Sequence, residues 1–206
     1  MNTCNKCSEY GLNFNHAYSP AQYLEGQPSS RVWIIGLNPK GETAYVDNRS
    51  EENLRQYFSE KGRVHEYFHD FQKVSKAMYD MMGKEDGVGH TDLVKCYSPE
   101  WPPNAAKGSR DRQAIIANCK EYLRQQLLAS AVAVLVCNGA DVSRYIQTII
   151  PVEENHETYY YGELNRRRIA VVLSGFIGRI DDYSKRRLGK EIEALMVELG
   201  ICNKGG

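Results

Sequence analysis

The chain has 206 residues, of which 42% are hydrophobic, and its 26 basic side chains balance its 26 acidic ones. This length can bury one substantial core, so we expect a single domain over residues 1–206. A net charge of zero counts mildly against nucleic-acid binding, which an excess of basic residues usually accompanies. No apolar run approaches the ~20 residues of a membrane-spanning helix, and the N-terminus lacks a signal-peptide layout. We therefore expect a cytoplasmic protein with no membrane partner, and we take it to be a monomer.

Short apolar runs rich in β-branched residues alternate with helical patterns along the chain. Buried parallel strands are predicted for "RVWIIGL" (31–37), "TDLVKC" (91–96), "AVAVLVC" (131–137) and "RIAVVLS" (168–174). Helices are predicted for 52–82, 112–130 and 140–150. Residues 157–174 indicate a strand, a glycine-containing turn and the next strand, and 181–200 a closing helix that begins at Asp and ends at Gly. This alternation is typical of the α/β class.

The four predicted strands all end in polar, Gly-rich or Pro-bearing segments. These segments are "GLNPKG" (36–41), "DLVKCYSP" (92–99), "CNGADV" (137–142) and "LSGFIGR" (173–179). In an open parallel sheet, ligands bind outside the carboxyl ends of the strands. We therefore expect the functional residues at this edge.

The six cysteines include one CxxC pair, Cys4 and Cys7. A reducing cytoplasm disfavours a disulfide framework, so clustered cysteines there more often bind metal. Cys137 falls inside a predicted buried strand and is interpreted as a small core residue, and Cys202 as a thiol of the C-terminal tail.

These segments, in this order, resemble the uracil-DNA glycosylase superfamily, especially its iron-sulfur branch. "GLNPKG" is similar to the first motif of the superfamily and closest to the "GINPG" form of its mismatch-type members. "TDLVKCYSP" parallels the "TNVVKCRPP" pattern of the iron-sulfur branch, and "CKEYLRQQLLASAVAVLVCNGADVSRYI" its Cys, helix, strand and Gly-Ala turn. With "LSGFIGR" the resemblance covers most of residues 1–195. It implies a three-layer α/β/α sandwich around a four-stranded parallel sheet.

The resemblance also implies a metal centre. It nominates Cys4, Cys7, Cys96 and Cys119 as ligands of a [4Fe-4S] cluster, for which four thiolates are the usual set. Four cysteines can equally hold zinc, so the ligand count leaves both metals open. The expected role is structural, with the cluster holding the N-terminal segment and the loop after Cys96 against the body of the domain.

Within the first motif, the resemblance places Asn38 where the attacking water is positioned. An amide is a weak base, which suits a path in which water traps a sugar that is already cationic. The alternative is a turn-forming Asn before Pro39. Substrate-binding positions are expected around it, with the glycines allowing close approach of the backbone and Tyr45 stacking on the extruded base. The full substrate-binding set is Gly36, Leu37, Pro39, Gly41 and Tyr45, together with Ser174 and Gly175 from the turn after the last strand.

Asp92 departs from the pattern, because the resembling enzymes have an Asn there that binds the uracil edge. A carboxylate only accepts hydrogen bonds. Opposite uracil O4 it would place one acceptor against another, whereas the N4 amino group of cytosine is a suitable donor. If burial protonates Asp92, it could instead donate to N3 of the leaving base. The alternative is a polar residue at a strand edge that never meets the base.

The last strand also departs from the pattern. Val172, Leu173 and Ser174 stand where many members have "HPS", so a His that stabilises the departing base is missing. The expected DNA contacts are Ser174, Gly175, Arg179, Lys185 and Arg186, through phosphate or, for Arg179, by entering the base stack. Solvated side chains on a helix face are the alternative for Lys185 and Arg186.

The sequence therefore predicts a DNA glycosylase whose catalytic residues are Asn38 and Asp92. Because removal of ordinary cytosine would destroy the genome of the host, the expected base is a modified cytosine, such as the hydroxymethyl or glucosyl-hydroxymethyl form in some phage DNA, and the expected role antiviral. The alternatives are a uracil-DNA glycosylase of base-excision repair, a non-catalytic DNA-binding module of the same fold, and a zinc-stabilised hydrolase of nucleotides.

Overall fold

A computed structural model describes residues 2–39, 50–59 and 64–202. Its main element is a six-stranded sheet in the order β4-β3-β5-β8-β7-β6, made of β3 (Val32–Gly36), β4 (Val88–Asp92), β5 (Val134–Asn138), β6 (Glu154–Asn155), β7 (Tyr159–Leu164) and β8 (Arg167–Ser174). The four adjacent strands β4, β3, β5 and β8 are parallel to one another, and β7 and β6 extend the sheet in antiparallel pairing. The predicted α/β class and parallel strands are confirmed, and the sheet is two strands wider than expected.

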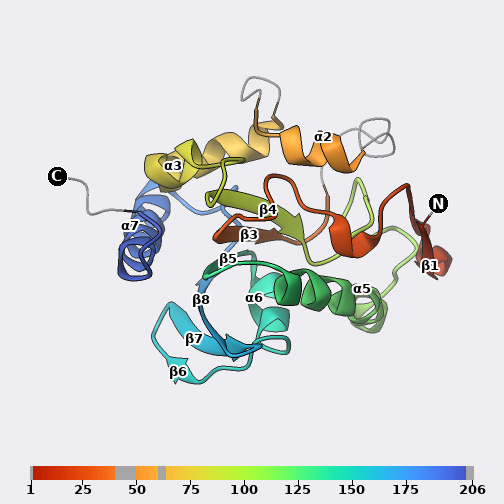
Figure 1. The fold of residues 1–206 in the computed structure, drawn as a ribbon. Helices are drawn as coiled ribbons and strands as arrows, with labels where there is room; N and C mark the ends of the chain where they lie inside the picture. Colours follow the sequence, from red (N-terminus) through yellow and green to blue (C-terminus); the bar gives the residue numbers. More distant parts are fainter. Residues whose placement is uncertain (1, 40–49, 60–63, 203–206) are drawn as a thin grey trace.

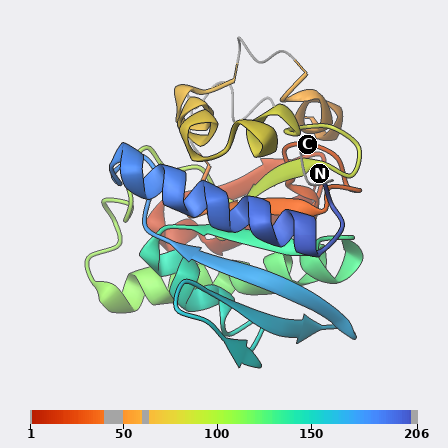
Figure 2. The same ribbon diagram turned by 90° about the vertical axis from the view of Figure 1, so that its left-hand side faces the viewer.

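Helices cover both faces of this sheet (Figure 1). One face packs against α5 (Ser109–Ala129) and α6 (Ala140–Ile146), and the other against α3 (Asp70–Val74), α4 (Lys76–Asp80) and α7 (Asp182–Glu198). Figure 2 shows α7 lying over the central strands. Alternate residues of β3 divide between the two cores, with Trp33 and Ile35 on the α5 side and Val32 and Ile34 on the α7 side, as a strand buried on both faces requires.

The N-terminal segment forms a small sheet of its own beside α5. Strands β1 (Asn2–Cys7) and β2 (Leu12–His16) pair antiparallel and are joined by the 3-10 helix η1 (Ser8–Tyr10). A second 3-10 helix, η2 (Pro20–Gln22), leads toward β3 and also contacts α5. This arrangement brings the N-terminal cysteines to the helix that carries Cys119.

Three predicted elements differ in the structure. The strand expected at 91–96 lies earlier, because Gly89 and His90 belong to β4 although they interrupt its apolar pattern. The helix expected over 52–82 is divided into α2 (Glu51–Gln56), the 3-10 helix η4 (Glu66–His69), α3 and α4. Between α3 and α4, Ser75 adopts an extended conformation, and its hydroxyl caps α4 by accepting from Met78 N. The hairpin turn lies at Asn165 and Arg166, which have φ of 53° and 62°, and not at a glycine.

The closing helix matches its prediction. The Asp181 carboxylate accepts from Tyr183 N and Ser184 N, and burial of Ile192 and Met196 fixes the inward face of α7. Gly200 ends the helix with a φ of 63°. No helix in the described ranges is long and apolar enough to span a bilayer.

Candidate active site

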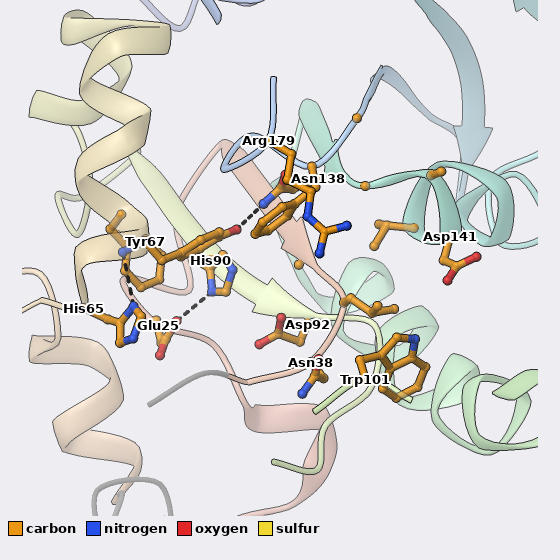
Figure 3. Close-up of a pocket in the computed structure, with 18 of the residues that line it drawn as sticks. Glu25, Asn38, His65, Tyr67, His90, Asp92, Trp101, Asn138, Asp141 and Arg179 are labelled. Atoms are coloured by element: carbon orange, nitrogen blue, oxygen red, sulfur yellow. Dashed lines mark hydrogen bonds and ion pairs between the residues drawn. The ribbon is translucent and has the colours of Figure 1, made fainter. Parts of the chain in front are cut away.

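A cavity of about 650 Å³ opens at the carboxyl edge of the parallel strands. The segments after β3, β5 and β8 line it together with the last residue of β4, and η4 closes one side (Figure 3). Both nominated catalytic residues, Asn38 and Asp92, belong to this lining. The structure therefore brings together side chains that lie 54 positions apart in the chain.

Asn38 is buried two residues after β3, with 3% of its surface exposed. Its Nδ2 donates to the main-chain oxygens of Ser98 and Pro39, at 3.1 and 3.3 Å. These bonds fix the orientation of the amide, and Oδ1 has no hydrogen-bond partner within the described residues. A buried acceptor of this kind can hold a water molecule by one of its protons.

Asp92 ends β4 and is 2% exposed. Its carboxylate occupies the space over Gly36 on the adjacent strand, where a Cβ would stand 2.2 Å from Asp92 Oδ1. A glycine is therefore needed at position 36, because the Asp92 side chain fills the space that a side chain at this position would occupy. Asp92 and Asn38 both line this cavity (Figure 3).

Two further polar residues, Glu25 and His90, form a buried pair on the same side of the cavity. Glu25 Oε2 lies 2.6 Å from His90 Nδ1, and the two side chains are 3% and 6% exposed. Their main chains also pair, with Glu25 N donating to His90 O and His90 N to Glu25 O, each at 2.8 Å. His90 is therefore held to Glu25 through both its main chain and its ring.

Aromatic side chains form the part of the wall next to His90. The rings of Tyr67 and Phe176 are nearly parallel, with 10° between their planes and 6.2 Å between their centroids. Asn138 Nδ2 donates to the Tyr67 hydroxyl, and Asn138 Oδ1 accepts from Ile177 N. Burial, and next the negative charge of Asp92, raise the pKa of Tyr67, so its phenol stays protonated at physiological pH. Such flat apolar surfaces suit the faces of a nucleobase.

A model of the uracil DNA glycosylase superfamily matches residues 24–195. The chain belongs to this superfamily. Its members are DNA glycosylases, so the cavity at the carboxyl edge is where an extruded base is expected. No curated protein matches the chain. The match begins after the CxxC pair, so it does not test the predicted iron-sulfur centre.

The other substrate-binding residues predicted for a glycosylase are only partly in place. Leu37 and Gly175 line the cavity, and Pro39 is buried and accepts from Asn38 Nδ2 through its main-chain oxygen. Gly41 and Tyr45 lie outside the described residues.

The predicted DNA contacts separate into two groups. Arg179 is exposed on the cavity wall, and its guanidinium lies 6.0 Å from the centre of the exposed Phe176 ring. Arg186 is also exposed and lies over the ring of Tyr183. These two can meet DNA. Ser174 does not line the cavity, and its hydroxyl donates to Gly175 O.

Lys185 is not available to DNA, and its prediction as a phosphate contact is wrong. The side chain is 6% exposed, and Nζ donates to Asp70 Oδ1 at 2.8 Å. The charge therefore joins α7 to α3 inside the molecule. Helical spacing was a signal that separates Lys185 from Arg186, because Lys185 stands four and seven residues before Gly189 and Ile192 on the buried face of α7.

The four nominated cysteines lie near one another. Cys7, Cys96 and Cys119 are buried and Cys4 is partly exposed, and the thiols of Cys7, Cys96 and Cys119 each interact electrostatically with the others of the set. Burial raises the pKa of Cys119 to about 11. Within the part of the chain that the structure describes, no three His, Cys, Asp or Glu side chains are arranged to hold a single metal ion.

Sequence reasoning missed Glu25, His90, Tyr67, Asn138 and Phe176. One signal was present for His90, which stands two residues before Asp92 in the same strand and so faces the same side. Asn138 and Phe176 lie in strand ends that were predicted to be functional, but nothing singled them out. Glu25 could not be found, because its role depends on an isolated bridge between β4 and a distant segment.

Proposed function

We propose that this protein is a DNA glycosylase that hydrolyses the N-glycosidic bond of a flipped-out modified cytosine and leaves an abasic site. The observation that carries the proposal is the placement of Asn38 and Asp92 in one cavity of a uracil-DNA glycosylase fold. The first supplies an acceptor for water and the second an acceptor for the base.

The chemistry requires little proton transfer from the protein at the sugar. As the bond between C1′ and the base nitrogen breaks, its electron pair leaves with the base and the sugar becomes cationic. Asn38, oriented by Ser98 O and Pro39 O, holds the water that adds to C1′. Correct placement of the water matters more than basicity here, because the cation is a strong electrophile. The surplus proton of the water leaves to solvent or to the departing base.

The identity of the base follows from Asp92. An ionised carboxylate accepts from the N4 amino group of a cytosine, and it opposes O4 of a uracil, acceptor against acceptor. Such a mismatch costs roughly 1 to 3 kcal/mol, which is about 5- to 160-fold in relative rate. The protein would thus act on an amino-bearing pyrimidine.

A substituent at C5 of that pyrimidine is supported by the size of the cavity. Its volume of about 650 Å³ exceeds the needs of one bare pyrimidine. Removal of unmodified cytosine would also damage the genome of the cell that makes the protein. We therefore propose hydroxymethylcytosine or its glucosylated form, as in some phage DNA, and a role in antiviral defence.

We further propose that Cys4, Cys7, Cys96 and Cys119 hold a [4Fe-4S] cluster. The donor set supports this, because the four thiols are close enough to interact electrostatically, and Tyr122 and Asn118 donate to the sulfurs of Cys4 and Cys7, both at 3.4 Å. A cluster takes one thiolate on each iron and so accepts wider spacing than one zinc ion with its ~2.3 Å bonds. When bound, the cluster would act as a structural crosslink, and the residues would attach the β1–β2 sheet to α5 and to the loop after β4.

A panel of duplexes tests the function. Each carries one uracil, cytosine, hydroxymethylcytosine or glucosylated hydroxymethylcytosine, and abasic sites are revealed by alkaline cleavage. Wild-type protein should release a modified cytosine, and Asp92→Asn should lose that preference and gain relative activity on uracil, since an amide can donate to O4. Wild-type activity on uracil alone would contradict the assignment of the base.

The missing His of the last strand leaves a non-catalytic DNA-binding module as the second candidate. Asn38→Ala separates the two. If the protein is an enzyme, Asn38→Ala should lose product formation and keep its affinity for DNA. If it is a binding module, neither wild type nor Asn38→Ala forms product.

A further inference from the structure

We propose that Glu25 and His90 are positioning residues that keep Asp92 ionised, so that a buried string of three residues, and not Asp92 alone, sets the preference for an amino-bearing base. The inference rests on the proposed function and names the part of the site that controls its specificity.

Glu25 and His90 form a rigid unit. The side chains meet at 2.6 Å and the main chains are joined by two hydrogen bonds of 2.8 Å. The imidazole also packs edge-on against Phe68, with 4.9 Å between ring centroids, and near Tyr67. With Nδ1 committed to Glu25, a proton taken up by the ring resides at Nε2, and the Glu25 carboxylate stabilises the resulting positive charge.

The Nε2 end of this ring lies over the same glycine as the Asp92 carboxylate. His90 and Asp92 alternate along β4 and project from the same face. A Cβ added to Gly36 would stand 3.0 Å from His90 Nε2 and 2.2 Å from Asp92 Oδ1, so both polar atoms lie over the same glycine. Figure 3 shows the imidazole between Glu25 and Asp92. The order of the string is therefore Glu25, His90, Asp92.

The charges of the string explain why the imidazole is needed. Glu25 and Asp92 are each 2% exposed, and burial of two neighbouring carboxylates disfavours ionisation of both unless positive charge lies close to them. The Tyr67 hydroxyl experiences the negative charge of both, which places the two carboxyl groups in one electrostatic environment. An imidazolium between them compensates this charge.

Among the described residues, the buried Lys95 also approaches Asp92. Lys95 Nζ donates to Asp92 O at 2.5 Å and to Gln126 Oε1, on the side of β4 away from His90. Burial lowers the pKa of Lys95 to about 7, and the negative charge of Asp92 opposes that shift. A substitution at His90 therefore tests whether the ionisation of Asp92 depends on the imidazole.

Loss of the imidazole charge should change the base that is accepted. Without it, one carboxyl group of the string takes up a proton, and a protonated Asp92 can donate to O4 of uracil. The ratio of cleavage rates, modified cytosine over uracil, should then fall. A structural role of His90 would lower both rates together and leave their ratio unchanged.

The experiment measures this ratio under single-turnover conditions for wild type, His90→Gln, and the double variant His90→Gln with Glu25→Gln. We chose Gln at position 90 because its amide can still donate to Glu25. The ratio should fall by about tenfold or more in the single variant and recover in the double variant, which carries one carboxyl group fewer. His156→Gln, on the far edge of the sheet, is the matched control and should keep the wild-type ratio. Because both rates come from one preparation, the folded fraction cancels.

A binding arm makes the inference independent of turnover. Duplexes with 2′-fluoroarabino analogues of cytosine and uracil resist cleavage, and their relative affinities should follow the same pattern across the variants. If wild type cleaves no base but prefers the cytosine analogue in a His90-dependent way, the proposed enzyme activity fails and the string stands. An unchanged ratio in His90→Gln, in rates and in affinities, would overturn the string.

Discussion

Gly36→Ala offers a direct test of whether the location of the Asp92 carboxylate matters. The added Cβ would stand 2.2 Å from Asp92 Oδ1, and separations below 3.0 Å are essentially never seen for real Cβ atoms. That contact must lengthen to at least 3.0 Å, so the carboxylate must move by about 0.8 Å. No left-handed φ is involved at this glycine, so the effect comes from the contact and not from the backbone.

The expected cost is larger for activity than for stability. A displacement near 1 Å in a reacting constellation can lower a rate by about 10²-fold. Overpacking costs about 1–3 kcal/mol, and the lower chain entropy of Ala in the unfolded state offsets about 0.4–1 kcal/mol of it. We therefore expect a stability loss of about 1–2 kcal/mol and a fall of about 10²-fold in the single-turnover rate.

The assay combines alkaline cleavage of abasic sites, on the modified duplex that wild type processes, with urea denaturation. Gly108→Ala is the matched control, since no atom lies within 4 Å of its added Cβ, and it should keep the wild-type rate. A folded Gly36→Ala protein with the wild-type rate and base preference would refute the claim that Asp92 binds the base from its position over Gly36.

Three further predictions concern the other charged and sulfur-bearing positions. Lys185→Met should lower the free energy of unfolding by about 1–3 kcal/mol in urea denaturation, because it breaks a partly buried ion pair, and should leave DNA affinity unchanged; weakened binding in a fully stable protein would restore Lys185 as a phosphate contact. Arg179→Ala should weaken DNA binding across sequences and reduce the salt slope by about one, whereas Arg168→Ala, on the far sheet edge, should change neither. Cys96→Ser should abolish the absorbance near about 400 nm and the bound iron expected of the purified protein, with Cys202→Ser as control; stoichiometric zinc without that absorbance would contradict the cluster.

Local sequence was sufficient where one segment determined its own structure. The apolar runs around Ile34, Val136 and Val171 predicted buried parallel strands, and Asp181 predicted the start of the last helix. Since ligands bind at the carboxyl ends of such strands, the edge that carries the cavity followed from the pattern as well. The resemblance to the glycosylase superfamily then nominated Asn38 and Asp92 at this edge.

Only the tertiary structure decided what depends on distant segments meeting. The bridge between Glu25 and His90, the burial of Lys185 against Asp70, and the space that Gly36 leaves for Asp92 all join elements that are remote in the chain. Hydrophobic periodicity specifies which face of an element is buried, but it does not specify which polar group of another element will be there. The sequence therefore nominated Asp92 but could not predict which charged side chains surround it.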